Sequence, residues 1–294
     1  MALDWRLSDR VLRLDRPLGV GIVNVTSDSM FSGARSETPE NAIADGLRLA
    51  RAGFDMLDLG AVAARSGPAV EAGDEASRLL PAIEGLAAVS TLPISADTFS
   101  AKVAAGALEA GAVAINDISG ALDPALFELA AETACGLVLM HIEGRPREDR
   151  EPPRFDDPID HLKGWFAERI EAASARGVEH DQIVLDPGLD FDLGVATGLE
   201  VLRRLGELHE LGRPIYLSLS RKDLLGAVLA GSWEARLPPE RRQWASCAAT
   251  ALAVSQGAQI HRLHDPSALQ AMRVAAAVRG GEAAALPYTE AANA

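Results

Sequence analysis

Eight apolar segments of strand length recur along this chain, and each ends on or near a charged or polar side chain. The segments fall near residues 18–24, 54–59, 93–97, 112–117, 137–141, 182–186, 214–219 and 258–263. Their polar residues are Asn24, Asp58, Asp97, Asn116 with Asp117, His141, Asp186, Ser220 with Arg221 and Lys222, and Arg262 with His264. Parallel strands that are buried on both faces have such continuous apolar sequences. A closed parallel barrel gathers the carboxyl ends of its strands on one face, where such folds carry their chemistry. The pattern therefore predicts an α/β fold, a (β/α)₈ TIM barrel, with its site on that face.

Helix-type segments alternate with these strands, as βα units require. We expect helices near 38–53, 73–89, 99–110, 123–134, 158–177, 196–211, 240–256 and 266–279. Three of them carry a start signal, a capping side chain followed by proline, at Thr38-Pro39, Asp123-Pro124 and Asp265-Pro266. With 294 residues, the chain fits one such barrel. We expect a hairpin over 1–17 that caps the barrel bottom, a single barrel domain over 18–280, and a flexible tail over 281–294.

Composition limits the class of protein. Hydrophobic residues make up 48% of the chain and aromatic residues only 4%, so aliphatic side chains must fill a large core. The net charge of −14 is spread along the sequence, which argues against nucleic-acid and anionic-membrane partners. The early charges disfavour a signal peptide, and no apolar run reaches the roughly 18 residues of a membrane span. The two distant cysteines, Cys135 and Cys247, indicate free buried thiols, and we expect a cytoplasmic location.

Three acid or amide side chains at strand ends form the first candidate site. Asp97, Asn116 and Asp186 each end an apolar strand, and a half-buried carboxylate there needs a partner. A ligand with several N–H donors along one edge, as in a pterin or guanine, satisfies that need. The alternative for each residue is a helix cap or a bond to loop amides. As a set on one barrel face, the three favour ligand binding.

Cationic side chains follow the last two strands. Arg221 and Lys222 come after the seventh strand, and Arg262 and His264 after the eighth, where barrels often bind phosphate. Arginine offers a bidentate fork to phosphate oxygens and lysine a point charge. The sequence therefore predicts a local anion site, with surface salt bridges as the alternative.

The first long connection supplies oxygen donors. Asn24 is followed by Thr26, Asp28 and Ser29, a set that suits a Mg²⁺ ion that keeps most of its waters and leans on substrate phosphates. A hydrogen-bonded turn is the other interpretation of this run. The connections at 25–37, 60–72 and 142–157 all follow strands and are long enough to be lids. The last is highly charged and suits a plain surface loop equally well.

Taken in order, several segments resemble the dihydropteroate synthases. These are GIVNVTSDS, DLG with ARSG, ISADTFSAKVAAGALEAGAVAINDISG, LVLMH, VLDPGLDF, SLSRK and RLHD, which together extend over about residues 18–280. The resemblance implies a (β/α)₈ barrel that joins 6-hydroxymethyl-7,8-dihydropterin pyrophosphate to p-aminobenzoate and releases pyrophosphate, with Mg²⁺ as cofactor. Dihydropteroate is an intermediate of folate synthesis, and sulfonamides compete with p-aminobenzoate in this family.

The resemblance also implies roles for individual residues. It places the pterin ring against Asp97, Asn116, Met140, Asp186, Phe191 and Lys222, and the pyrophosphate against Asn24, Arg262 and His264, with Asn24 on the Mg²⁺ side. Catalytic roles fall to Asp97, Lys222, Arg262 and His264, and the second substrate to Arg65 and Asp223. Family members are often dimers through late helices, and the Ala-rich faces of 245–256 and 267–278 suit a homodimer or packing within the chain.

The second-substrate side departs from the family pattern. The family has GGESTRPG after the second strand, whereas this chain has GAVAARSG, which keeps Arg65 but has Ala64 for threonine. Asp223 replaces the last serine of SRKS, which commonly helps to hold the aminobenzoate carboxylate. A carboxylate about 4 Å from that group costs about 1–4 kcal/mol. Asp190 and Asp192, in DFDL where the family has GFGK, are expected to add negative charge near the path of an anion.

These departures leave several functions open. The chain is either a divergent synthase with a rebuilt aminobenzoate pocket and reduced sensitivity or insensitivity to sulfonamides, or a paralogue that binds pterin and has changed or lost its second substrate. A non-catalytic pterin-binding protein is a third candidate, and a pterin-dependent methyl transferase is a fourth. Against the methyl transferase stand Arg262 and His264, which suit pyrophosphate, and the lack of a corrinoid module in the sequence.

Overall fold

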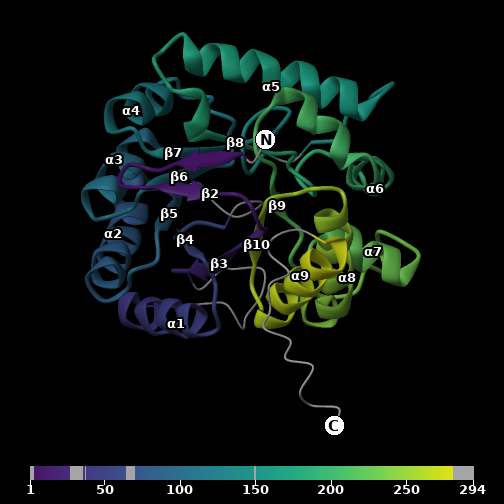
Figure 1. Cartoon of the computed structure of the whole chain (residues 1–294), viewed down its shortest axis with the longest axis horizontal. Helices are drawn as coiled ribbons and strands as arrows, with labels where there is room; N and C mark the ends of the chain where they lie inside the picture. Colours follow the sequence, from purple (N-terminus) through teal and green to yellow (C-terminus); the bar gives the residue numbers. More distant parts are fainter. Residues whose placement is uncertain (1–2, 27–35, 37, 64–69, 149, 281–294) are drawn as a thin grey trace.

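Eight parallel strands form the centre of the molecule (Figure 1). The computed structural model describes residues 3–26, 36, 38–63, 70–148 and 150–280. In spatial order the sheet runs β8-β7-β6-β5-β4-β3-β10-β9, and a bridge between Leu185 and Ile215 joins its two edges. The strands are β3 Leu18–Asn24, β4 Met56–Gly60, β5 Ile94–Asp97, β6 Ala114–Asp117, β7 Gly136–Met140, β8 Ile183–Asp186, β9 Tyr216–Ser218 and β10 Ile260–Leu263. The predicted (β/α)₈ barrel is confirmed.

Helices surround this barrel (Figure 1). They are α1 Pro39–Arg51, α2 Ala72–Val89, α3 Ala101–Glu109, α4 Ala125–Thr133, α5 Pro158–Ser174, α6 Val195–Arg203, α7 Asp223–Ala230, α8 Gln243–Ser255 and α9 Pro266–Arg279. Short 3₁₀ segments occur at His180–Gln182, Leu205–Leu211 and Pro239–Arg241. The predicted cap at Thr38 is present, because its side chain accepts a hydrogen bond from the Asn41 amide at 3.3 Å. Asp265 has no such cap bond; it binds Arg221 instead.

Two helix predictions were wrong in detail. The expected single helix at 196–211 ends at Arg203 and continues as the 3₁₀ segment, which contains Gly206, a poor helix former. The sequence analysis also missed α7. This helix has eight residues, and five of them are buried from Asp223 to Ala227, so it shows no apolar stripe against a polar face.

The strands place two different layers of side chains inside the barrel. Because side chains alternate along a strand, residues two apart point the same way. The lower layer is apolar and consists of Val20, Met56, Ala114, Val138, Val184, Tyr216 and Ile260. Two residues further along the same strands stand Ile22, Asp58, Asn116, Met140, Asp186, Ser218 and Arg262. The packed lower layer thus forms a floor beneath a layer rich in charged and amide groups.

The predicted N-terminal hairpin closes the bottom of the barrel. Strands β1 Asp4–Arg6 and β2 Val11–Arg13 pair antiparallel, and they cross in front of the barrel in the view of Figure 1. Trp5 is fully buried against the lower layer, and its indole Nε1 donates to the backbone oxygen of Gln182 at 2.8 Å. This face is therefore sealed, which leaves the carboxyl ends of the strands for ligands.

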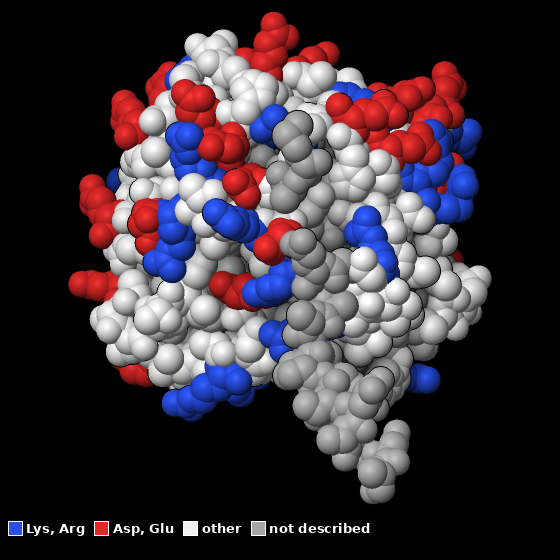
Figure 2. Space-filling model, in the orientation of Figure 1, with Lys and Arg blue, Asp and Glu red and all other residues white. Residues whose placement is uncertain are grey.

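The surface and the thiols agree with the sequence analysis. On the face drawn in Figure 2, acidic and basic side chains are interspersed. Both cysteines are free; Cys135 is buried, which raises the pKa of its thiol to about 11, whereas Cys247 is half-buried. Among the described helices, none combines the length and apolar character that crossing a bilayer requires. The predicted tail at 281–294 lies outside the described residues.

Candidate active site

A row of strand ends brings three predicted site residues together. The pairing of neighbouring strands aligns Asn24 with Gly60, Gly60 with Asp97, and Asp97 with Asn116. Gly60 matters because a Cβ there would lie 3.1 Å from the Cβ of Asp97 and 3.3 Å from its Oδ2. The missing side chain therefore leaves the space in which Asp97 sits, next to Asn24 and Asn116.

Asp58 connects the polar side chains inside the barrel. Its side chain is fully buried and accepts hydrogen bonds from Ser95 Oγ at 2.5 Å, Asn116 Nδ2 at 3.0 Å and Arg262 Nε at 2.6 Å. The sequence analysis noted Asp58 but gave it no place in the site. The signal was present, since a carboxylate inside a buried strand needs partners that only the barrel interior can supply.

Arg262 is shared between two carboxylates. Besides its bond to Asp58, its Nη2 donates to Asp97 Oδ2 at 2.7 Å, while its side chain stays 16% exposed. The resemblance assigns Arg262 to pyrophosphate, and the structure places it among the carboxylates of the pterin side as well. One guanidinium thus balances two buried acids and keeps an exposed edge toward the mouth of the barrel.

Burial raises the pKa of two acids that were predicted to contact the pterin. The pKa of Asp97 rises to about 7, because burial and the neighbouring Asp58, Glu75 and Asp117 carboxylates outweigh the attraction of Arg262. The pKa of Asp186 rises to about 6, again through burial, against the Gly188 amide and the charges of Lys222 and Arg262. Both carboxyl groups therefore change charge near neutral pH, as groups at functional sites often do.

Asp186 faces the cationic side of the mouth. Its Oδ1 accepts from the Gly188 amide at 2.8 Å, and β7 pairing sets Met140 beside it. Met140 packs with Ile118, Ile142, Phe99 and Phe191 in a small apolar cluster, and the Lys222 ammonium lies 4.6 Å from the centre of the Phe191 ring. This combination, a carboxylate beside an apolar wall with a lysine over an aromatic ring, suits a flat heterocycle.

His264 is a neutral polar group at the same mouth. Burial, together with the positive charges of Arg262, Arg221 and Lys222, lowers the pKa of His264 to about 3. The Ser220 hydroxyl lies 2.9 Å from His264 Nδ1 and also accepts from the His264 amide. The hydroxyl proton can therefore go to Nδ1, which leaves Nε2 as a hydrogen-bond donor.

Arg221, the other predicted cation, serves the scaffold. Its guanidinium binds both carboxylate oxygens of Asp265 and donates to the Pro239 oxygen. The backbone of Arg221 has a positive φ of 58°, and its carbonyl accepts from Arg242. Of the four predicted anion-site residues, Lys222, Arg262 and His264 remain the candidates for binding an anion.

The three acids that depart from the family pattern, Asp190, Asp192 and Asp223, have partners within the fold. Asp223 is 7% exposed and pairs with Arg242 Nη1 at 2.6 Å and Arg236 Nε at 3.4 Å. Asp190 accepts from the first amides of α7, those of Asp223 and Leu224. Asp192 accepts from the Glu143 amide at 2.7 Å and lies near Arg150. Asp190 and Asp192 therefore each hold a backbone segment in place, and the expectation that they add negative charge near the path of an anion stays a prediction.

Several predicted residues fall where the structure describes nothing. Arg65, the remaining second-substrate residue, and Asp28 and Ser29 of the first connection lie outside the described residues. Asn24 is described, and its backbone oxygen accepts from the Ser36 amide at 2.8 Å. Thr26 is buried just beyond it. The oxygen donors considered for Mg²⁺ thus reduce, among the described residues, to Asn24 and its neighbour Thr26.

Chemically, the mouth offers two kinds of contact. The carboxylates of Asp97 and Asp186 and the amide of Asn116 can accept hydrogen bonds from ring N–H groups. Lys222, Arg262 and His264 can donate to an anion on the same molecule. A ligand that satisfies both sides carries a donor-rich ring joined to an anionic group.

The sequence of this chain matches one family of known proteins. A profile described as "Pterin binding enzyme" matches residues 20–264. The dihydropteroate synthase of Escherichia coli strain K12 is 33% identical over 90% of this chain and 92% of its own length. A probable bifunctional folylpolyglutamate synthase/dihydropteroate synthase of Halobacterium salinarum is 39% identical over 91% of this chain, which spans only 32% of that longer protein.

Two further similarities bear on the second substrate. A Mycobacterium leprae protein named inactive dihydropteroate synthase 2 is 36% identical over 93% of this chain and 94% of its own length. The solved structure of a Xanthomonas albilineans dihydropteroate synthase with 4-aminobenzoic acid superposes with a TM-score of 0.84 at 38% identity, covering 94% of this chain and 99% of that one. The family profile, the sequence identity and the shared fold agree: the chain belongs to the pterin binding enzyme family, as a relative of the dihydropteroate synthases.

Proposed function

We propose that this chain is a transferase that joins 6-hydroxymethyl-7,8-dihydropterin pyrophosphate to p-aminobenzoate and releases pyrophosphate, a step of folate synthesis. The observation that carries the proposal is the meeting of Asp97, Asn116 and Asp186 with Lys222, Arg262 and His264 at one mouth of the barrel. The first three accept from the pterin ring and the last three bind the anionic leaving group. Met140 and Phe191 form the apolar wall of the ring pocket.

The chemistry follows from the charges around the mouth. When the bond from the pterin methylene to the pyrophosphate oxygen breaks, its electron pair leaves with pyrophosphate and positive charge develops on the pterin. Ionised Asp97 stabilises that positive charge, while the exposed edge of Arg262 and the neutral His264 donate to the leaving oxygens. The amine nitrogen of p-aminobenzoate then forms the new bond to the methylene carbon and gives up its proton to water or to the released pyrophosphate.

Asn24 provides a place for Mg²⁺ at this mouth. Its amide oxygen is the hard donor that Mg²⁺ prefers, and it ends the strand beside Gly60 and Asp97. An ion held there would neutralise charge on the leaving pyrophosphate. Asn24 and Thr26 are the described donors considered for it, so the ion would depend on substrate oxygens and water for its other ligands.

A turnover assay tests the proposed reaction directly. The purified protein, supplied with pterin pyrophosphate, p-aminobenzoate and Mg²⁺, is expected to form dihydropteroate and pyrophosphate in equal amounts. Release of pyrophosphate without dihydropteroate would indicate a changed second substrate. The absence of both products at high enzyme concentration would leave the pterin-binding paralogue, for which the inactive Mycobacterium leprae relative is a precedent.

Asp223 determines how well the second substrate fits. Its ion pairs with Arg242 and Arg236 offset part of its charge, so we propose that its repulsion of the aminobenzoate carboxylate is near the low end of the electrostatic range, about 1 kcal/mol. Asp223→Ser is therefore expected to lower the KM for p-aminobenzoate about fivefold and to strengthen sulfonamide inhibition. Asp181→Ser is the control, because Asp181 pairs with Arg6 of the hairpin at the other end of the barrel, and it should leave this KM unchanged. An unchanged KM in Asp223→Ser would indicate that the carboxylate of p-aminobenzoate binds away from α7.

We also propose that the chain forms a homodimer through α8 and α9. These helices pack side by side, and apolar side chains on them face outward, with Trp244 79% exposed and Val278 82% exposed, joined by Leu252 and Val274. Exposed apolar groups gathered on neighbouring elements mark interaction surfaces. Light scattering after size exclusion is expected to give a dimer mass, and Val278→Asp with Trp244→Glu is expected to give a monomer. A monomeric mass for the unaltered protein would contradict the proposal.

A further inference from the structure

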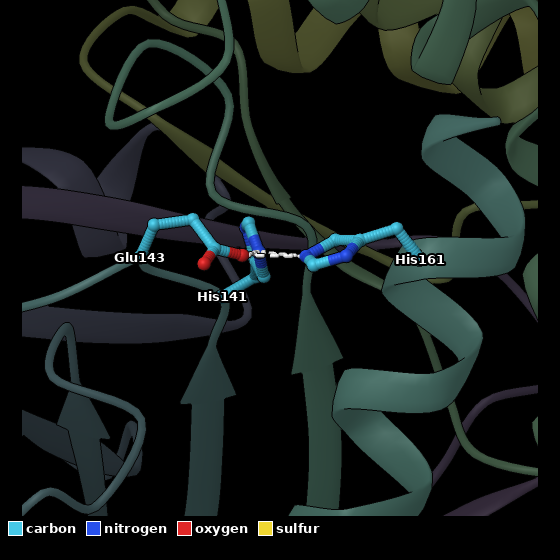
Figure 3. Close-up of side chains that lie close together, drawn as sticks. All are labelled: His141, Glu143 and His161. Atoms are coloured by element: carbon cyan, nitrogen blue, oxygen red, sulfur yellow. Dashed lines mark hydrogen bonds and ion pairs between the residues drawn. The ribbon is translucent and has the colours of Figure 1, made fainter. Parts of the chain in front are cut away.

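Three side chains outside the pterin site converge on a single point. The imidazoles of His141 and His161 and the carboxylate of Glu143, here called the His–Glu–His cluster, point their donor atoms at one another (Figure 3). The Nε2 atoms of the two histidines lie 3.3 Å apart, and Glu143 Oε1 lies 2.9 Å from His141 Nε2 and 2.5 Å from His161 Nε2. All three ligand atoms fall within 4.8 Å of one another.

Rigid elements hold the members of the cluster in place. His141 directly follows β7, and its amide donates to the Asp186 carbonyl at 2.8 Å. Glu143 lies two residues later, where its amide donates to Asp192 Oδ2. His161 is on the first turn of α5, which Asp157 caps through the amides of residues 159 and 160. The cluster therefore joins the end of a barrel strand to the start of an outer helix.

The surroundings suit a bound ion. His141 is fully buried. The centres of the His141 and Trp165 rings lie 5.1 Å apart in an edge-to-face arrangement, and the centres of the His161 and Phe155 rings lie 4.3 Å apart. The side chains of Glu143 and His161 stay 29% and 32% exposed, which gives access from solvent. His141 Nδ1 has no hydrogen-bond partner among the described residues. No second bond therefore fixes the tautomer of His141, and Nε2 can present its lone pair to a metal.

The donor set selects the class of metal. Two imidazole nitrogens and one carboxylate oxygen are ligands that Zn²⁺ accepts at about 2.0–2.2 Å. Two ligand atoms bound at that length to a tetrahedral ion stand about 3.3 Å apart. The Nε2 atoms have this spacing, whereas the distances of 2.9 and 2.5 Å from Glu143 Oε1 must lengthen when the ion binds. Mg²⁺ prefers oxygen ligands in an octahedron, so this site and the proposed Mg²⁺ position at Asn24 differ in chemistry.

We propose that the His–Glu–His cluster binds a divalent first-row transition-metal ion, with Zn²⁺ as the best fit and water in the fourth position. The ion links the connection after β7 to α5. That connection directly follows Met140, which lies in the apolar cluster with Phe191, and it is held by Asp192, the neighbour of Phe191. The metal therefore stabilises this apolar cluster and takes no part in the transfer reaction.

Hydrogen bonds alone can also explain the arrangement, since both Nε2–H groups can donate to Glu143 Oε1. Cobalt binding separates the two explanations without any substrate. Tag-free protein is stripped with a chelator and titrated with Co²⁺, whose visible absorption is intense in four-coordinate sites and weak in six-coordinate ones. Stoichiometric uptake with an intense spectrum, reversed by Zn²⁺ and unaffected by excess Mg²⁺, is the expected result.

Three variants locate the ion. His161→Ala removes one ligand, and Glu143→Gln keeps an oxygen that can accept hydrogen bonds while it removes the charge. Changes to groups that only support metal ligands weaken binding about 10–100-fold, so loss of a ligand is expected to weaken Co²⁺ binding by more than about tenfold. His180→Ala, an exposed histidine on a 3₁₀ segment, is the control and should bind like the unaltered protein.

Thermal unfolding gives a second readout that is independent of colour. Zn²⁺ should raise the Tm of the unaltered protein and of His180→Ala, and leave that of His161→Ala and Glu143→Gln unchanged. Absent or weak six-coordinate Co²⁺ absorption in the unaltered protein would overturn the proposal. Equal Co²⁺ affinity in the unaltered protein and His161→Ala would also overturn it, because the ion would then be bound elsewhere.

Discussion

Replacing Arg262 with alanine is expected to lower the free energy of unfolding by about 3–5 kcal/mol. The guanidinium is the partner of both Asp58 and Asp97, at 2.6 and 2.7 Å. Asp58 is fully buried, and without Arg262 it keeps only Ser95 and Asn116 as described hydrogen-bond donors. Removing one member of a buried ion pair leaves a charge that water cannot reach, and that penalty dominates. Urea unfolding at neutral pH measures the loss.

The pH dependence of the loss tests whether unpaired buried carboxylates cause it. At about pH 5 the Asp97 carboxyl, whose pKa burial already raises, holds a proton and needs no cation, so the loss in Arg262→Ala should shrink there. Arg262→Lys keeps a positive charge but loses the planar guanidinium that can bind two carboxylates at once, so it should recover part of the stability. Arg204→Ala, which breaks exposed ion pairs with Glu207 and Asp157, is the control and should cost about 1 kcal/mol or less. A loss below about 1 kcal/mol in Arg262→Ala would contradict the shared-cation arrangement.

Asp97→Asn is expected to separate stability from binding. The pKa of Asp97 lies near 7, so the folded state binds its proton more tightly than the unfolded chain does. Its contribution to stability is present below about pH 4 and is lost as the pH rises through about 7. Asparagine carries no charge at any pH, so the variant does not lose this stability as the pH rises. At about pH 8 the variant should therefore be more stable than the unaltered protein, by up to about 4 kcal/mol.

Pterin binding should change in the opposite direction. A charged acceptor for a ring N–H is worth about 1.5–3 kcal/mol, so Asp97→Asn is expected to weaken pterin pyrophosphate binding about 10- to 150-fold. For the unaltered protein, affinity should rise as the pH increases through about 6 and 7, where Asp186 and Asp97 ionise. The variant should keep only the lower step. Unchanged affinity and pH profile in Asp97→Asn would remove this residue from the pterin site.

The sequence predicted the barrel because its signals are local. Continuous apolar runs with polar ends mark buried parallel strands, and the period of two residues inside each strand places the polar group inward or outward. Asp97, Asn116 and Asp186 could be assigned to one mouth before their contacts were known because each ends such a strand, and the carboxyl ends of barrel strands share one face. Asp117 also ended a strand, and the structure assigns it to the scaffold, since it accepts from Ser119 and the Ala121 amide.

Partners that are distant in sequence could not be predicted. Arg262 and Asp58 are 204 residues apart, and only the closed barrel shows that one cation serves two acids. Asp223 looked like an unpaired repulsive charge because its partner Arg242 comes later in the sequence, beyond the short helix α7, and that helix was itself missed. His161 lies on α5 with nothing in the sequence to connect it with the end of β7. Each of these failures concerns a contact between elements.

Calorimetry with pterin pyrophosphate tests the central claim, that one molecule bridges the carboxylates and the cations of the barrel mouth. We expect pterin pyrophosphate with Mg²⁺ to bind at least about tenfold more tightly than the same pterin without pyrophosphate, and Arg262→Lys and His264→Ala to remove most of that difference. Asp97→Asn should weaken both ligands alike. Equal affinity for the two ligands, or binding that no change at Asp97 or Arg262 affects, would contradict the proposed site.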